Sequence, residues 1–117
     1  MSQHHKINYI EIPVKDLATS KVFFTQVFAW NFVDYGPDYA SINNGGINGG
    51  IFLSDETVST ATGSVLVVIY SENLEHSQQR VLEHGGKIVK GIFTFPGGRR
   101  FHFSDPIGNE YAIWSDK

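Results

Sequence analysis

The sequence predicts an α+β domain made of two consecutive βαβββ repeats, and three observations support this. Residues 7–28 (INYIEIPVKDLATSKVFFTQVF) and 64–85 (SVLVVIYSENLEHSQQRVLEHG) match at a constant offset of 57. IFLSD at 51–55 resembles AIWSD at 112–116, at an offset of 61. Each copy begins with an apolar run typical of a strand, continues with apolar residues at helical spacing, and ends with further strand-like runs. We therefore expect a single domain over residues 1–117, with repeats at about 6–55 and 63–116 and a cleft between or across them.

In the first repeat, apolar alternation predicts strands and a period near 3.6 predicts one helix. The expected strands are residues 6–14, 30–35, 39–43 and 47–54. Asp16 is a good N-cap for a helix over 17–29. Its inner face is expected to carry Leu17, Val22, Phe23, Val27 and Phe28. The polar segment 55–63 is interpreted as a mobile link between the repeats.

The second repeat is expected to open with a strand at 64–70 that is buried on both faces. A helix over 73–84 would place Leu74, Val81 and Leu82 inward and end at Gly85 and Gly86. Further strands are expected at 87–95, 99–104 and 110–115. Short connections between successive strands imply antiparallel pairing within each repeat.

Composition excludes several classes of function. The net charge of −3 comes without any run of like charge, so nothing indicates binding to nucleic acid or to a membrane surface. There is no cysteine, which excludes disulfides and thiolate chemistry and fits a reducing interior. With no apolar signal core at residues 1–5, we expect a cytoplasmic protein. Aromatic residues make up 14% of the chain, which suits either a ring-lined cavity or core packing.

Three segments carry a resemblance to a known family. They are DPIGNEYAIWS at 105–115, LEHGGKIV at 82–89 and INYIEIPVKDLATSKVFFTQVFAW at 7–30. With the duplicated plan, they resemble the glyoxalase/bleomycin resistance/dioxygenase domains of the vicinal oxygen chelate (VOC) superfamily. Small single-domain members related to lactoylglutathione lyase are the most similar. The resemblance implies curved mixed sheets around a cleft, and a homodimer.

The resemblance also implies where a metal would be held, because metal-dependent members use four ligands at defined strand positions. Those positions fall here on Tyr9, Ile51, Leu66 and Ala112. Three of them have no donor atom, and a phenol is a poor ligand for a divalent ion. We therefore expect no metal cofactor, with a displaced divalent metal site as the alternative.

Glu11, Glu110 and His102 are the candidate catalytic residues. Each glutamate lies two residues from a ligand position, so strand alternation keeps both on the cleft face. There they can serve acid–base chemistry or an unusual metal, or they can lie in solvent or pair with Arg99, Arg100 or a lysine. His102 can act as a base or bind substrate, or it can pair with a neighbour such as Asp105.

The expected ligand-binding cleft is lined by Tyr9, Leu66, Tyr70, Ala112 and Trp114, which strand parity places on one face. Such a wall suits a planar or apolar small molecule, and a filled core is the competing interpretation. Arg99 and Arg100 follow two glycines and can either hold an anion or lie in a solvated turn.

The favoured function is therefore metal-independent binding of a small hydrophobic or aromatic molecule, as in the bleomycin-resistance branch of the superfamily. The alternative is a lyase, isomerase or dioxygenase type of enzyme with a displaced metal built from Glu11, His102 and Glu110. A structural or regulatory dimer module is a third possibility. Whether the chain is an enzyme, and on which molecule it acts, is not decided by the sequence.

Overall fold

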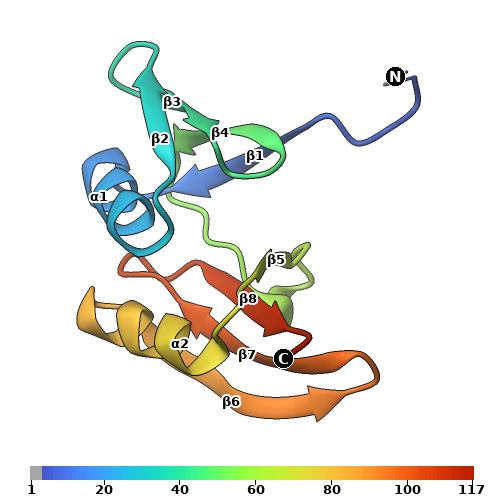
Figure 1. Cartoon of the computed structure of the whole chain (residues 1–117). Coiled ribbons are helices and arrows are strands. Elements are labelled where there is room, and N and C mark those ends of the chain that lie inside the picture. Colours follow the sequence, from blue (N-terminus) through green and yellow to red (C-terminus); the bar gives the residue numbers. More distant parts are fainter. Residues whose placement is uncertain (1–3) are drawn as a thin grey trace. The chain divides into compact units, whose positions relative to one another are not determined.

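The computed structural model describes residues 4–117. Its contacts divide the described chain into two compact units, one ending at Glu56 and the other spanning Thr57–Lys117 (Figure 1). Each unit has one four-stranded mixed sheet and one α-helix among the described residues, so the α+β class and the βαβββ plan are confirmed. The predictions that involve residues 1–3 lie outside the described residues. The single-domain organisation stays a prediction.

The first unit contains β1 (Tyr9–Val14), α1 (Leu17–Phe28), β2 (Asn31–Asp34), β3 (Tyr39–Asn43) and β4 (Asn48–Leu53). Its strand order is β1-β4-β3-β2, and β1 pairs with β4 in parallel. The other pairs are antiparallel, as the short connections predict. Asp16 caps α1 by accepting a hydrogen bond from the Thr19 amide at 3.1 Å, as predicted.

One face of the first sheet carries the core of its unit. Its buried side chains are Ile12, Val14, Phe23, Phe24, Trp30, Ala40, Ile42 and Ile51. The rings of Phe24 and Trp30 stack at 4.8 Å between centroids. The inward prediction for Val22 is wrong, because its side chain is 54% exposed. Val22 lies about 200° around the helix from the buried Phe24, so both cannot face the sheet.

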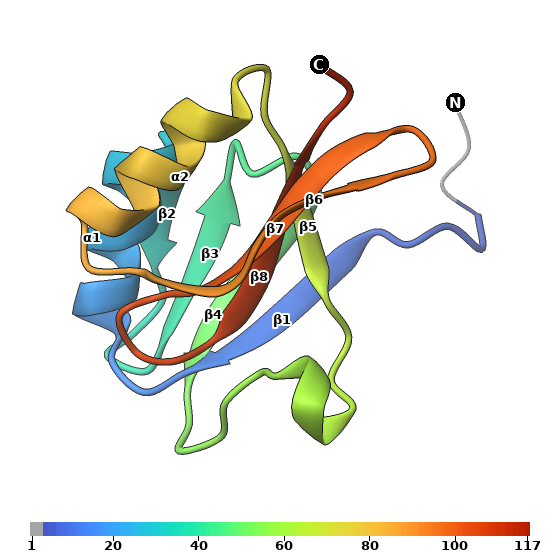
Figure 2. The same cartoon turned by 90° about the horizontal axis from the view of Figure 1, so that it is seen from below.

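The second unit contains η1 (Thr60–Thr62), β5 (Val67–Tyr70), α2 (Leu74–Glu83), β6 (Lys87–Phe95), β7 (Gly98–Ser104) and β8 (Glu110–Ser115). Its order, β5-β8-β7-β6, repeats that of the first sheet, with β5 and β8 parallel. Figure 2 shows η1 as the short green coil in the segment between β4 and β5. Phe101, Phe103, Tyr111 and Ile113 are fully buried, as are Leu74 and Val81 of α2.

Three expectations for the second repeat are wrong. Leu82 is 52% exposed, because it follows Val81 on the helix and points about 100° away from it. The first strand is not buried on both faces, since Val68 and Tyr70 are more than 40% exposed. Residues 58–60 are not a free link. The Val58 amide donates to Asn109 Oδ1 at 2.8 Å, and Val58 O accepts from the Glu110 amide at 2.8 Å.

Candidate functional site

The open face of the second sheet gathers the chemically useful side chains of its unit. Arg100 lies opposite Trp114, and His102 lies opposite Ala112, in the β7–β8 register. Ala112 in turn lies beside Val68 of β5. Alternation therefore sends these side chains to the face opposite the one that packs Phe101 and Phe103.

His102 and Glu110 form an ion-pair geometry on this face, with Nδ1 of the imidazole 2.8 Å from Glu110 Oε2. Both residues are buried, at 8% and 5% exposed. Glu110 also accepts from the Thr60 amide at 2.8 Å and from the Thr60 hydroxyl at 2.9 and 3.1 Å. The carboxylate therefore has hydrogen-bond partners on both oxygens.

The protonation of this pair follows from its contacts. Burial acts to raise the pKa of Glu110, but the hydrogen bonds from His102 and Thr60 outweigh it and lower the pKa below its ordinary value. An ionised carboxylate can only accept, so Nδ1 of His102 carries a proton and donates it. The other ring nitrogen, Nε2, is buried and has no hydrogen-bond partner. The imidazole is thus oriented by Glu110 and presents an unused nitrogen.

An aromatic wall continues from His102 across the same face. The ring of Phe93 lies 6.0 Å from the imidazole, and the Trp114 ring lies 6.3 Å from Phe95 and 5.1 Å from Tyr70. Tyr70 donates to Asp116 Oδ1 at 2.5 Å, which raises the pKa of the Tyr70 phenol. The rings come from three different strands, β5, β6 and β8.

Two cationic side chains lie over this wall. Lys90 Nζ is 4.3 Å from the Phe93 ring centroid. Arg100 Cζ is 5.4 Å from the Phe93 ring and 5.6 Å from the Phe95 ring. The Arg100 Nε atom is buried without a hydrogen-bond partner. Arg99, its neighbour, points to the other face and pairs with Glu75 at 2.5 Å.

The first unit has a different group on the open face of its own sheet. The phenols of Tyr9 and Tyr39 are hydrogen-bonded to each other, and Tyr39 donates to Glu11 Oε2 at 2.9 Å. The hydrogen bond with Tyr9, then burial and Glu11, raise the pKa of Tyr39. Gly50 makes room for this group, because a Cβ there would lie 2.0 Å from the Tyr39 hydroxyl.

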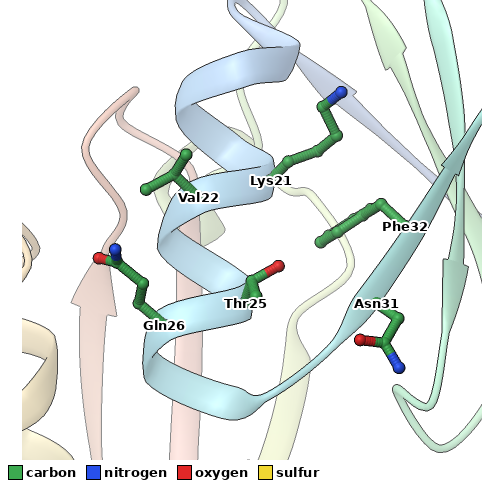
Figure 3. A pocket seen from close by; sticks show the side chains of 6 residues that line it. All are labelled: Lys21, Val22, Thr25, Gln26, Asn31 and Phe32. Atoms are coloured by element: carbon green, nitrogen blue, oxygen red, sulfur yellow. The ribbon is translucent and has the colours of Figure 1, made fainter.

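The described residues of the first unit form surface hollows in at least two places. One, of about 430 Å³, is lined by Tyr9, Tyr35, Tyr39, Ser41, Ile42, Asn43, Asn48 and Gly49. The other, of about 420 Å³, lies between α1 and β2 and is lined by Lys21, Val22, Thr25, Gln26, Asn31 and Phe32 (Figure 3). Lys21 is its only charged lining residue, and it is already paired with Asp34 at 2.8 Å. This second hollow therefore offers mainly neutral hydrogen-bonding groups.

The structure joins two of the three candidate catalytic residues. His102 pairs with Glu110 and not with Asp105. Glu11 belongs to the first unit, where its partner is a phenol and not an arginine or a lysine. No group of three or more histidine, aspartate and glutamate side chains within residues 4–117 is arranged to hold a metal.

The predicted metal positions need one correction. Ile51 pairs with Ile12 in the register and is buried in the core, so it does not lie on the face that carries Tyr9. Gly50, opposite Glu11, takes that place. Ala112, opposite Val68, is its counterpart 62 positions later, so the offset of 61 is one residue short. The loop between the third and fourth strands absorbs the extra residue.

The predicted cleft residues are placed as follows. Tyr70, Ala112 and Trp114 share the open face of the second sheet. Leu66 lies immediately before β5. Tyr9 lies on the open face of the first sheet, and its part in a common cleft stays a prediction.

Sequence reasoning missed Thr60 and Phe93 as members of the site, and it named Arg100 as a possible anion-binding residue without placing it beside His102. Thr60 lies in a polar segment with no period, so no signal marked it. The shared face of Arg100 and His102 could have been predicted, because alternation along β7 sends both side chains to the same side of the sheet. Phe93 lies opposite Arg100 on β6, although a bulge separates it from Lys90.

The sequence profile of the Glyoxalase/Bleomycin resistance protein/Dioxygenase superfamily matches residues 6–113. The chain belongs to this superfamily. No helix among residues 4–117 is long and apolar enough to cross a membrane. Among curated proteins, none matches the VOC chain significantly.

Solved structures of the superfamily share the fold. A glyoxalase/bleomycin resistance protein/dioxygenase family enzyme from Burkholderia phytofirmans PsJN superposes with a TM-score of 0.78 at 13% identity, covering 94% of this chain and 98% of that one. A fosfomycin resistance protein from Listeria monocytogenes superposes with a TM-score of 0.75 at 16% identity, covering 93% of this chain and 91% of that one. TioX from Micromonospora sp. ML1 gives 0.71 at 20%, covering 94% and 98%. At these identities the likeness establishes the VOC fold alone.

Proposed function

We propose that this VOC protein binds a small aromatic or otherwise apolar molecule against the open face of its second sheet. The observation that carries the proposal is the aromatic wall of Tyr70, Phe93, Phe95 and Trp114. The Tyr70 side chain is 45% exposed, and none of the four rings belongs to the buried core. Rings gathered in this way bind planar molecules through stacking and through burial of apolar area.

The proposal does not use the metal of metal-dependent relatives. Of the positions equivalent to their ligands, Leu66, Gly50 and Ala112 have no donor side chain. The fourth, Tyr9, has a phenol that is hydrogen-bonded to Tyr39. A site for a divalent ion needs several oxygen or nitrogen donors together, and these residues do not fit one.

Titration calorimetry with a neutral planar probe, 2-naphthamide, tests the proposal. We expect saturable binding, and we expect Tyr70→Ala to weaken it about tenfold because one wall of the stack is removed. Tyr35→Ala is the matched control, since Tyr35 is an exposed tyrosine of the first unit. Unchanged affinity in Tyr70→Ala, or loss of binding in the control alone, would contradict this location.

A metal-dependent lyase, isomerase or dioxygenase type of enzyme is the second candidate, and one observation favours it. A histidine that binds a metal commonly donates its other ring N–H to a carboxylate, as His102 does to Glu110. Thermal shifts on adding Ni²⁺, Zn²⁺, Mn²⁺ or Fe²⁺, with metal analysis of the purified protein, test it. Stoichiometric metal that is lost in Glu110→Ala would replace the metal-free proposal.

We also propose that the protein is a cytoplasmic homodimer, because the resemblance to the superfamily implies one. Light scattering after size-exclusion chromatography tests the oligomeric state. A monomer at micromolar concentration would contradict it.

A further inference from the structure

We propose that the molecule bound at the second sheet is an aromatic acid, a planar ring carrying a carboxyl group. This inference rests on the proposed function and names the class of its ligand. Its basis is two buried polar atoms without hydrogen-bond partners on one strand, Arg100 Nε and His102 Nε2. Buried polar atoms are nearly always paired in folded proteins, so two on one face indicate a missing partner.

The two atoms belong to one recognition surface. Arg100 and His102 are two residues apart on β7, so their Cα atoms are about 7 Å apart and their side chains share a face. Both groups flank the same ring, since Phe93 lies 5.4 Å from Arg100 Cζ and 6.0 Å from the imidazole. A carboxyl group on a ring stacked against this wall presents two oxygens to two neighbouring nitrogens.

The charges on this face favour an anion. Arg100 and Lys90 have no carboxylate within ion-pair distance in the part of the chain that the structure describes. Two acids contact the residues of this face, and both have partners: Glu110 accepts from His102 and Thr60, and Asp116 accepts from Tyr70. A ligand carboxylate would therefore meet two cations without a competing internal partner, and hydrogen bonds between charged groups are the strong ones.

The imidazole suits either protonation state of such a ligand. With Nδ1–H donated to Glu110, a neutral His102 offers a lone pair on Nε2 to the O–H of an undissociated acid. When the proton passes along that bond, the O–H bond breaks and an N–H bond forms. The result is a carboxylate beside an imidazolium that Glu110 stabilises, with no change in total charge. A ring that is already protonated donates from Nε2 to the ligand carboxylate directly.

The test compares 2-naphthoate with 2-naphthamide, which share a ring and a shape but differ in charge. By calorimetry at neutral pH, we expect the acid to bind the natural protein about tenfold more tightly, the effect of one charge-assisted hydrogen bond. Arg100→Gln should reduce that ratio to near one. Arg99→Gln removes the same charge from the adjacent residue on the opposite face and should leave the ratio unchanged.

The outcomes separate this inference from the proposed function. If neither probe binds, both are wrong. If both bind with equal affinity, or if Arg99→Gln lowers the ratio as much as Arg100→Gln, the aromatic site stands and the acid inference is overturned. Salt provides a second measurement that needs no variant. Raising NaCl from 0.05 to about 0.5 M should weaken binding of the naphthoate and leave that of the naphthamide unchanged.

Discussion

Replacing Glu110 by alanine should destabilise the second unit strongly, because the carboxylate is the shared acceptor of a buried cluster. The substitution leaves His102 Nδ1 without its partner at 2.8 Å. A buried donor left unsatisfied costs about 1–3 kcal/mol. The Thr60 amide and hydroxyl lose their acceptor too, but Thr60 is exposed and water replaces it at about 0–1 kcal/mol. The free energy of unfolding should therefore fall by about 1–4 kcal/mol at pH 7.

Urea unfolding followed by circular dichroism measures this loss, and Glu11→Ala is the matched control. Glu11 is also a glutamate on an open sheet face, but it is exposed and its Oε2 accepts a hydrogen bond from Tyr39. Its removal should cost less than about 1 kcal/mol. Thr60→Val keeps the hydrogen bond from the backbone amide to Glu110 and removes only the one from the hydroxyl. Its loss of unfolding free energy should lie between those of Glu110→Ala and Glu11→Ala.

The pH dependence of the stability difference distinguishes the loss of a carboxylate from a loss of packing, because a loss of packing would be the same at every pH. The pKa of Glu110 is lowered in the folded protein, so its contribution is complete above the ordinary value of 4.5 and is lost as the pH falls through the lowered pKa. The difference between natural protein and Glu110→Ala should thus stay constant from pH 7 to about 5 and shrink below that. A difference under about 1 kcal/mol at pH 7, or one that does not shrink in acid, would refute the reasoning.

Two further predictions concern a glycine pair and a buried acid. Gly50→Ala should cost about 1–3 kcal/mol of unfolding free energy, because its Cβ meets the Tyr39 hydroxyl, and Tyr39→Ser should recover most of that loss. Gly49→Ala should cost more and should not be recovered by Tyr39→Ser, because its Cβ lies 2.6 Å from the Ile10 carbonyl oxygen; equal costs and equal recovery would contradict this. Burial raises the pKa of Asp105 to about 6, although hydrogen bonds from the backbone of its own turn act to lower it. Because the folded protein holds this proton more tightly than the unfolded chain, the free energy of unfolding should fall by roughly 3 kcal/mol as the pH rises from about 4 to above 6. Urea unfolding of Asp105→Asn across this range should lack that fall, and an unchanged fall would assign it to another group.

Much of the fold follows from local patterns in the sequence. Strands β3, β6 and β8 begin and end at the predicted residues, because turns rich in glycine, proline and asparagine bound each of them. The core predictions failed where two adjacent residues competed for one face, as Val81 and Leu82 do on α2. Hydrophobicity alone cannot choose between neighbours about 100° apart.

The site was only partly predictable, and the reason is geometric. The pairing of His102 with Glu110 follows from a hairpin in which Ser104 lies opposite Glu110, since the diagonal neighbour shares its face. Knowing the turn at 105–109 was therefore sufficient to suggest this pair. Thr60 reaches Glu110 from fifty positions away, and nothing in its polar surroundings indicates that contact. The sequence did not reveal that the offset near the last strands is 62 and not 61. IFLSD and AIWSD align well at 61, and that alignment matches Ile51, and not Gly50, with Ala112.

The closing of each sheet by its own first and last strands has a consequence for folding kinetics. In β1–β4 the first pair joins positions 9 and 48, 39 apart, and in β5–β8 it joins positions 67 and 111, 44 apart. The entropy of closing these two loops differs by only about 0.1 kcal/mol, because the cost grows with the logarithm of length. Loop closure therefore gives neither half a faster folding rate than the other. Any order in which the halves form must come from the intrinsic stability of their helices and hairpins.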